Sequence, residues 1–232
     1  MSRSIVILCP LKFEAAHARR ALRGLDARVV VTGPGAVAVR HAVDRLARQA
    51  ACSGRELMVV LFGACGGLCD MREVAPLIGR VRDLSGRVWG IEGVQAGVAV
   101  VGVDRAVITP GEKAWVREKS GAELVDCESH GFAEACVLAG LRWRVVRGVS
   151  DGEGDALPRG IEGWVRSDGA TRFSRVAWAC VTSPRLVPAV LRLGRRSGAA
   201  LREAGASLRG VVEDWLGEAE RESAERPAGV RA

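Results

Sequence analysis

Residues 57–68 carry the stretch Leu57-Met58-Val59-Val60-Leu61-Phe62-Gly63-Ala64-Cys65-Gly66-Gly67-Leu68. Residues 57–62 are a continuous apolar run of the length of a buried strand, and the glycines after them predict a turn. The same order occurs earlier, where a β-branched strand at 28–32 precedes Gly33-Pro34-Gly35 and a predicted helix over 36–51. Repeated units of this kind predict an α/β fold whose sheet is covered by helices on both faces.

Other segments continue the alternation of strands and helices. We expect strands at residues 4–9, 97–103 and 143–149, and helices over 12–24, 112–120 and 127–139. After residue 155 the sequence predicts two amphipathic helices, near 184–193 and 197–216. Residues 1–217 are therefore expected to form one domain, and 218–232 a disordered tail.

Length and composition narrow the class of protein. A chain of 232 residues can bury a full core, and none of its apolar runs reaches the about 20 residues of a membrane span. The seven cysteines show no Cys-x-x-Cys pairs, which predicts a protein of the reducing cytoplasm without a disulfide framework or zinc site. The net charge is +7, but Tyr is absent, so no stacking platform for nucleic acid is visible and no nucleic-acid partner is expected.

Three carboxylates stand at the ends of predicted elements. Glu14 lies in the first helix, Glu128 opens the helix over 127–139, and Asp151 follows the strand 143–149. Because ligands of open α/β sheets gather at the carboxyl ends of strands, we expect one shared pocket. Such a set suits proton transfer and hydroxyl recognition, which predicts an enzyme. The structural alternatives are a helix-stabilising Glu128 and an Asx turn at Asp151.

The glycine-rich segment 63–68 offers backbone N–H groups that could bind an anion or a sugar hydroxyl. It lacks the Gly-Lys-Ser/Thr of a Walker loop and the spacing of a dinucleotide-binding fingerprint. A tight structural turn is the alternative interpretation.

Five motifs in this order resemble those of the nucleoside phosphorylase and nucleosidase superfamily, in particular its methylthioadenosine/S-adenosylhomocysteine nucleosidases. The motifs are Pro10-Leu11-Lys12-Phe13-Glu14, Thr32-Gly33-Pro34-Gly35, Gly63-Ala64-Cys65-Gly66-Gly67-Leu68, Val125-Asp126-Cys127-Glu128 and Arg147-Gly148-Val149-Ser150-Asp151. The resemblance implies a three-layer α/β/α single domain with a central mixed twisted sheet. Residues 1–217 would then be a catalytic domain that needs no cofactor and no metal.

The resemblance also implies the roles of single residues in cleaving the N-glycosidic bond of an adenosine derivative. Asp151 would protonate N7 of the base, Glu14 would activate water, and Glu128 would bind the ribose hydroxyls. The remaining substrate contacts would come from Cys127, Ser150, Gly66, Gly35 and Arg147. Leu61 stands where phosphorylases carry an arginine, which favours water over phosphate as the nucleophile. The region of the base-stacking aromatic is shortened, with Trp115 as a substitute.

A narrower likeness concerns the hopanoid-associated branch of the superfamily, which implies adenosylhopane as the substrate. It rests on Thr109-Pro110-Gly111-Glu112-Lys113, on Glu128-Ser129-His130 and on the Arg-rich C-terminal part. The alternatives are a methylthioadenosine, adenosylhomocysteine or futalosine nucleosidase, a phosphorylase, and a non-catalytic binding module. Ala64 and Cys127, which replace the family's Ser and Met, motivate the binding module.

Two expectations concern assembly and location. Family relatives commonly form dimers, so the resemblance implies a homodimer. The stretch 183–209 is basic and amphipathic, and such a stretch can rest on an anionic membrane surface. An ordinary surface helix of an Arg-rich protein is the alternative.

Overall fold

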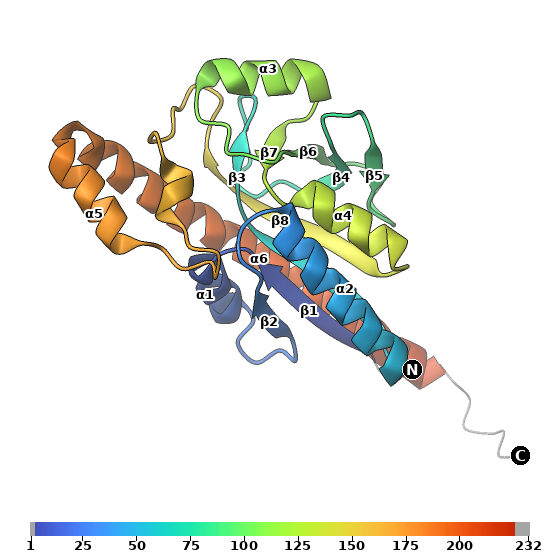
Figure 1. Cartoon of the computed structure of the whole chain (residues 1–232). Coiled ribbons are helices and arrows are strands. Elements are labelled where there is room, and N and C mark those ends of the chain that lie inside the picture. The colour runs from blue at the N-terminus through green and yellow to red at the C-terminus, as the bar shows by residue number, and fades with distance from the viewer. Residues whose placement is uncertain (1–2, 226–232) are drawn as a thin grey trace, which may run out of the picture.

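The computed structural model describes residues 3–225, and within them a mixed eight-stranded sheet is packed among six α-helices (Figure 1). The strands are β1 (Arg3–Cys9), β2 (Arg28–Val31), β3 (Glu56–Gly67), β4 (Ile78–Arg82), β5 (Val88–Gly90), β6 (Val98–Gly102), β7 (Leu124–Asp126) and β8 (Arg142–Asp151). The helices are α1 (Lys12–Ala21), α2 (Ala36–Ser53), α3 (Pro110–Ser120), α4 (Ser129–Leu138), α5 (Phe173–Thr182) and α6 (Val187–Glu225), with short 3-10 helices η1 (Ile161–Trp164) and η2 (Pro184–Leu186).

The long strand β3 joins the two halves of the sheet. It runs parallel to β1 and β8, and its last residues, Gly66 and Gly67, pair antiparallel with β7. The strand order is β2-β1-β3-β7-β6-β4-β5, and β8 also pairs with β3. The prediction of a turn at residues 63–67 was therefore wrong, because pairing with β8 along residues 63–66 and with β7 at Gly66 and Gly67 keeps this glycine-rich segment extended.

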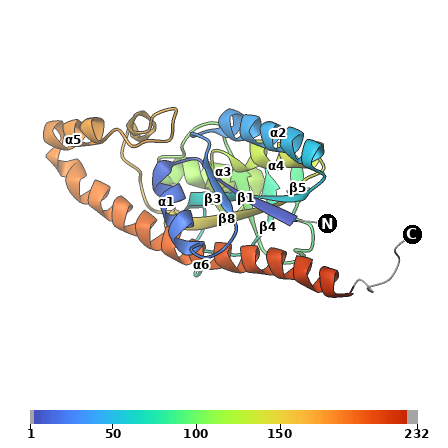
Figure 2. The ribbon, with the colours of Figure 1, turned by 90° about the horizontal axis from the view of Figure 1, so that it is seen from below.

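Alternating side chains of β1 divide the core into two layers. Val6 and Leu8 pack with residues of α2 and α4, whereas Ile5 and Ile7 pack with residues of α1 and α6. Figure 2 shows α2 and α4 on one side of the strands and α6 on the other. The three-layer α/β/α architecture is thus confirmed. A third apolar cluster, which includes Val101, Val116 and Val125, lies beneath α3.

The C-terminal region differs from the prediction of two helices. A single helix, α6, runs from Val187 through Glu225, because its apolar residues 201, 204, 208 and 212 are all buried against the sheet. This packing outweighs the helix-weakening effect of Gly194 and Gly198. The helix continues into the segment expected to be a disordered tail, of which residues 226–232 lie outside the described range. The sequence analysis missed α5 altogether.

Within residues 3–225, no helix combines the length and the apolar character that a bilayer span requires.

Candidate active site

A cavity of about 440 Å³ opens where β1, β6, β7 and β8 end, and Glu14, Glu128 and Asp151 all line it. The expectation that these carboxylates share one pocket is confirmed. Four other candidate residues line the same cavity: Cys127, Ser150, Gly66 and Gly35. The chain therefore brings residues from both ends of the segment 14–151 to one place.

Glu14 is fixed at the floor of the cavity by two backbone groups. Its Oε2 accepts a hydrogen bond from Leu11 N (2.9 Å), which ties it to the start of α1, and its Oε1 accepts one from Ala64 N (2.9 Å) on β3. The side chain is buried, and this burial raises its pKa to about 7, against the opposing effect of the Arg147 charge. A carboxyl group with such a pKa can take up and release a proton near neutral pH.

Glu128 lies just before α4 and faces the Thr32–Gly35 turn. Its Oε1 accepts a hydrogen bond from Gly35 N (3.0 Å), and its Oε2 lies 3.4 Å from Arg147 Nη2. Gly35 has a φ of +91°, a conformation that favours glycine. Burial raises the pKa of Glu128, and the Arg147 charge opposes that rise. The turn thus holds a carboxylate that still has free lone pairs toward the cavity.

Arg147 does not line the cavity, which corrects its predicted role as a substrate contact. Its guanidinium is buried behind the carboxylates, where Nη2 lies 2.6 Å from Asp126 Oδ2 and Nε donates to the same oxygen at 2.7 Å. Asp126 also accepts hydrogen bonds from Glu128 N (3.1 Å) and from the Ser129 backbone N–H and hydroxyl. Arg147 and Asp126 therefore form an ion pair that supports the loop carrying Glu128.

Two glycines of β3 leave room for these side chains. A Cβ at position 63 would collide with Arg147 Nη1 and Glu14 Oε1, and a Cβ at position 66 would lie 3.2 Å from Asp151 Oδ2. The glycine-rich motif is thus part of a strand rather than a loop, and its residues Ala64, Cys65 and Gly66 line the cavity. Its missing side chains let Glu14, Arg147 and Asp151 approach the strand.

Asp151 ends β8 and has a partner that the sequence analysis did not identify. Lys113, on α3, is fully buried and donates from Nζ to Asp151 Oδ2 at 2.5 Å and to the Gly152 carbonyl at 2.5 Å. The Ser150 hydroxyl donates to the other carboxylate oxygen at 2.7 Å. A signal existed in the sequence: Lys113, Val116 and Ser120 are spaced as one buried face of a helix.

The rest of the cavity wall is largely apolar. The apolar residues Val103, Val107, Leu157, Ile161 and Val165 line the same cavity, and the described lining contains no aromatic residue. Trp115 is about half exposed and lies elsewhere, so its predicted role in base stacking was wrong. No group of three or more metal-ligating side chains occurs among residues 3–225.

The sheet and the helices form an α/β fold that is shared with solved nucleosidases. The chain is similar to a Helicobacter pylori methylthioadenosine/S-adenosylhomocysteine nucleosidase mutant with 5′-methylthioadenosine in its active site, with 12% identity over 94% of this chain and 100% of that chain and a TM-score of 0.62. It is also similar to a futalosine hydrolase of the same organism, with 11% identity over 94% of this chain and 99% of that chain and a TM-score of 0.63.

A third similar structure is the Neisseria meningitidis methylthioadenosine/S-adenosylhomocysteine nucleosidase in complex with methylthio-immucillin-A. It shares 13% identity over 93% of this chain and 99% of that chain, with a TM-score of 0.62. No protein-family model matches the chain, and no curated protein matches it. At these identities the likeness establishes the fold.

Proposed function

We propose that the protein is a nucleosidase that hydrolyses the N-glycosidic bond of an adenosine derivative and releases adenine. The observation that carries this proposal is the convergence of Glu14, Glu128 and Asp151 on one cavity. The similar structures support an adenosine-like ligand, since one of them holds methylthioadenosine and another holds methylthio-immucillin-A.

Each carboxylate has a position that suits one step of this reaction. Glu128, fixed by Gly35 N, accepts hydrogen bonds from the ribose hydroxyls. Asp151 faces the leaving base, so that the departing purine is neutral rather than anionic. Glu14 orients the attacking water and takes its proton as the ribosyl carbon develops positive charge.

Water is favoured over phosphate by the charges around the cavity. Arg105 is the one cationic side chain in the described lining, and its guanidinium already pairs with Glu112 at 2.8 Å. Arg147 lies behind the carboxylates and is neutralised by Asp126. A phosphate dianion beside three buried carboxylates would meet repulsion with no cationic clamp to offset it.

The activity is tested by incubating the purified protein with methylthioadenosine, adenosylhomocysteine, futalosine and adenosylhopane, with and without phosphate. Release of the free base together with a free ribose product, at a rate that does not depend on phosphate, supports the proposal. Formation of ribose 1-phosphate supports a phosphorylase instead. Binding of these compounds without any base release supports a non-catalytic binding module.

For the substrate, we propose a nucleoside with a large apolar group on the 5′ side, with adenosylhopane as the candidate. The support is the apolar wall formed by Leu157, Ile161 and Val165, which leads from the cavity toward η1 and α5. A kcat/KM for adenosylhopane that exceeds those for methylthioadenosine and adenosylhomocysteine is the expected result. Equal or lower values for the lipid substrate would contradict this substrate class.

The raised pKa of Glu14 predicts how the rate depends on pH. Because the carboxylate form is needed as the base and burial raises the pKa to about 7, kcat is expected to rise with pH and level off above about pH 7. Glu14→Gln is expected to lower kcat by about 10²- to 10⁴-fold and to remove this limb of the profile. Glu118→Gln, an exposed carboxylate on α3, serves as the control. A limb near pH 7 that persists in Glu14→Gln would contradict the assignment.

For the cellular location, we propose cytoplasmic residence with peripheral contact to the inner face of an anionic membrane. The contact surface is the arm, defined as α5, η2 and residues 187–196 of α6, which projects beyond the sheet (Figures 1 and 2).

Phe173, Trp178 and Val181 of the arm are all more than two-thirds exposed, and none of the residues of α5 is buried. Residues 171–196 contain six arginines and no acidic residue, against a net charge of +7 for the whole chain. Exposed aromatic side chains among arginines suit an anionic lipid surface, whereas a second positively charged arm would be repelled.

Co-sedimentation with phosphatidylglycerol and phosphatidylcholine vesicles tests the arm. Binding to the anionic vesicles alone is expected, and Arg175→Ser, Arg185→Ser and Arg192→Ser combined should weaken it about 100-fold, since each arginine contributes about 1 kcal/mol. The matched control replaces three exposed arginines that lie outside the arm, Arg20, Arg23 and Arg48, by serine. Unchanged vesicle binding by the arm variant would contradict the proposal.

The homodimer stays a prediction, and light scattering of the purified protein measures it. If the same arm variant converts a dimer to a monomer without affecting vesicle binding, the arm is a surface between two copies of the chain.

A further inference from the structure

The contacts of Asp151 raise the question of where its proton comes from. Its Oδ2 accepts a hydrogen bond from the Lys113 ammonium, and its Oδ1 lies 2.7 Å from the Ser150 hydroxyl, whose one proton is shared between Asp151 and the Cys65 carbonyl at 3.1 Å. A carboxylate oxygen that faces an ammonium is the acceptor of that pair, so a proton that leaves from the Oδ2 side comes from Lys113.

Lys113 is the neighbour with a proton to yield. Its Nζ lies 2.5 Å from Asp151 Oδ2, and the side chain is fully buried between α3 and the end of β8. It does not line the substrate cavity, so it reaches the reaction only through Asp151. A lysine ammonium can release a proton in a buried site, whereas an arginine guanidinium cannot.

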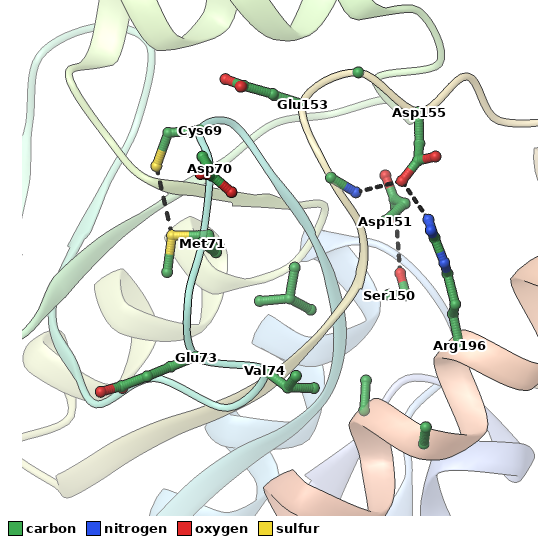
Figure 3. Close-up of a pocket in the computed structure, with 15 residues that line it drawn as sticks. Cys69, Asp70, Met71, Glu73, Val74, Ser150, Asp151, Glu153, Asp155 and Arg196 are labelled. Carbon is green, nitrogen blue, oxygen red and sulfur yellow. Dashed lines mark hydrogen bonds and ion pairs between the residues drawn. The ribbon is translucent and has the colours of Figure 1, made fainter.

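Asp151 also lies between two cavities, which gives the pair a route to solvent. A second cavity of about 520 Å³ is lined by Ser150 and Asp151 on the side of Asp155 and Arg196 (Figure 3). In Figure 3 the Asp155 carboxylate bridges Gly152 N and Arg196, next to the strand end that carries Asp151. Protons from water can therefore reach the Lys113–Asp151 pair while substrate occupies the other cavity.

We propose that Lys113 supplies, through Asp151, the proton that neutralises the leaving base. This inference rests on the proposed nucleosidase function and adds a residue to its machinery. Asp151 alone would be a proton acceptor, and the buried pair turns it into a relay. Lys113 acts through Asp151 and makes no contact with the substrate.

The bond between C1′ and the base nitrogen breaks, its electron pair goes to the base, and Asp151 delivers a proton to N7 while Lys113 Nζ passes one to Asp151. The water oxygen bonds to C1′ and its proton goes to Glu14, so that ribose and adenine leave as neutral products. Lys113 ends as an amine and Glu14 as an acid. Proton exchange with solvent restores both.

The first test compares Lys113→Arg with Lys113→Met on the best adenosine substrate. Arginine keeps the positive charge but cannot release a proton, so both variants are expected to lose about 10²- to 10⁴-fold in kcat with KM unchanged. The control is the pair Lys119→Arg and Lys119→Met, at an exposed lysine of the same helix. A Lys113→Arg variant with the wild-type kcat would show that charge alone suffices and would overturn the inference.

A second test uses leaving groups that need no proton, which separates proton supply from a folding defect. The probes are the N7-methylated form of the same substrate and 4-nitrophenyl β-ribofuranoside. For any probe that the wild type cleaves, both Lys113 variants are expected to cleave it at nearly the wild-type rate. Equal losses on these probes and on the natural base would assign Lys113 a structural role and overturn the inference. A wild-type protein that cleaves no nucleoside at all overturns the proposed function instead.

Discussion

Replacing Asp151 by asparagine is expected to lower kcat for adenine release by about 10²- to 10⁴-fold, the usual contribution of a positioned acid. The amide keeps the shape of the side chain but cannot pass a proton from Lys113 to the base. The substitution also leaves the buried Lys113 ammonium without its carboxylate, which costs stability as well as activity. Steady-state kinetics together with thermal unfolding measure the two effects separately.

The matched control for this variant is Asp168→Asn, because Asp168 is an exposed carboxylate that also pairs with a lysine, Lys12, at 2.9 Å. Its loss is expected to leave kcat unchanged and the free energy of unfolding within about 1 kcal/mol. An Asp151→Asn protein that releases adenine at the wild-type rate would remove Asp151 from the mechanism.

Replacing Arg147 by methionine is expected to lower the free energy of unfolding by about 3–5 kcal/mol. Its guanidinium is buried beneath the site and pairs with Asp126, with Glu128 beside it. Without it, two buried carboxylates lose their counter-charge, and a typical domain has only about 5–15 kcal/mol of stability in total. Denaturant unfolding followed by circular dichroism measures the difference.

Two further variants show whether the effect comes from the buried charge. Arg142→Met, at the exposed start of the same strand, is expected to cost about 1 kcal/mol or less, since its pair with Glu56 is solvent-exposed. The double variant Arg147→Met, Asp126→Asn is expected to be more stable than Arg147→Met alone, because it removes one unpaired charge. If Arg147→Met unfolds like the wild type, the ion pair does not support the site.

The sequence was sufficient to predict the carboxylate cavity because each acid stands at the end of an element with a clear pattern. Glu14 follows an apolar run, and Asp151 ends another, so the rule that strand ends meet at one edge places them together. The same reasoning predicted the covering of the sheet on both faces, since the apolar runs of residues 4–9 and 57–62 are too continuous for a strand with one solvated face.

Residues 63–67 were predicted as a turn because glycine is the commonest residue of turns. In the structure these glycines lie in an extended strand. The space that a side chain would need at Gly63 and Gly66 is occupied by the side chains of Glu14, Arg147 and Asp151. Nothing local in the sequence distinguishes a glycine that turns the chain from one that admits a neighbour. The pairing of β3 with β7 and β8 makes that distinction, and it depends on residues far along the chain.

The burial of Lys113 and helix α5 were not predicted, for different reasons. A lysine on a helix is normally solvated, so its burial could be recognised only from the apolar spacing of Val116 and its partnership with Asp151. Helix α5 does have an apolar stripe, but none of its residues is buried, so its place outside the core could not be read from the pattern.

The glycine gaps in β3 divide the protein into a part that cannot vary and a part that can. The acids approach β3 where Gly63 leaves no room for a Cβ. The wall at residues 157–165, by contrast, belongs to loop and 3-10 segments outside the eight-stranded sheet, with one isolated bridge between Val165 and Thr171. Substitutions at residues 157–165 can therefore change the shape of this wall without touching Glu14, Glu128 or Asp151. The same scaffold can thus admit different ligands while it keeps the same three carboxylates.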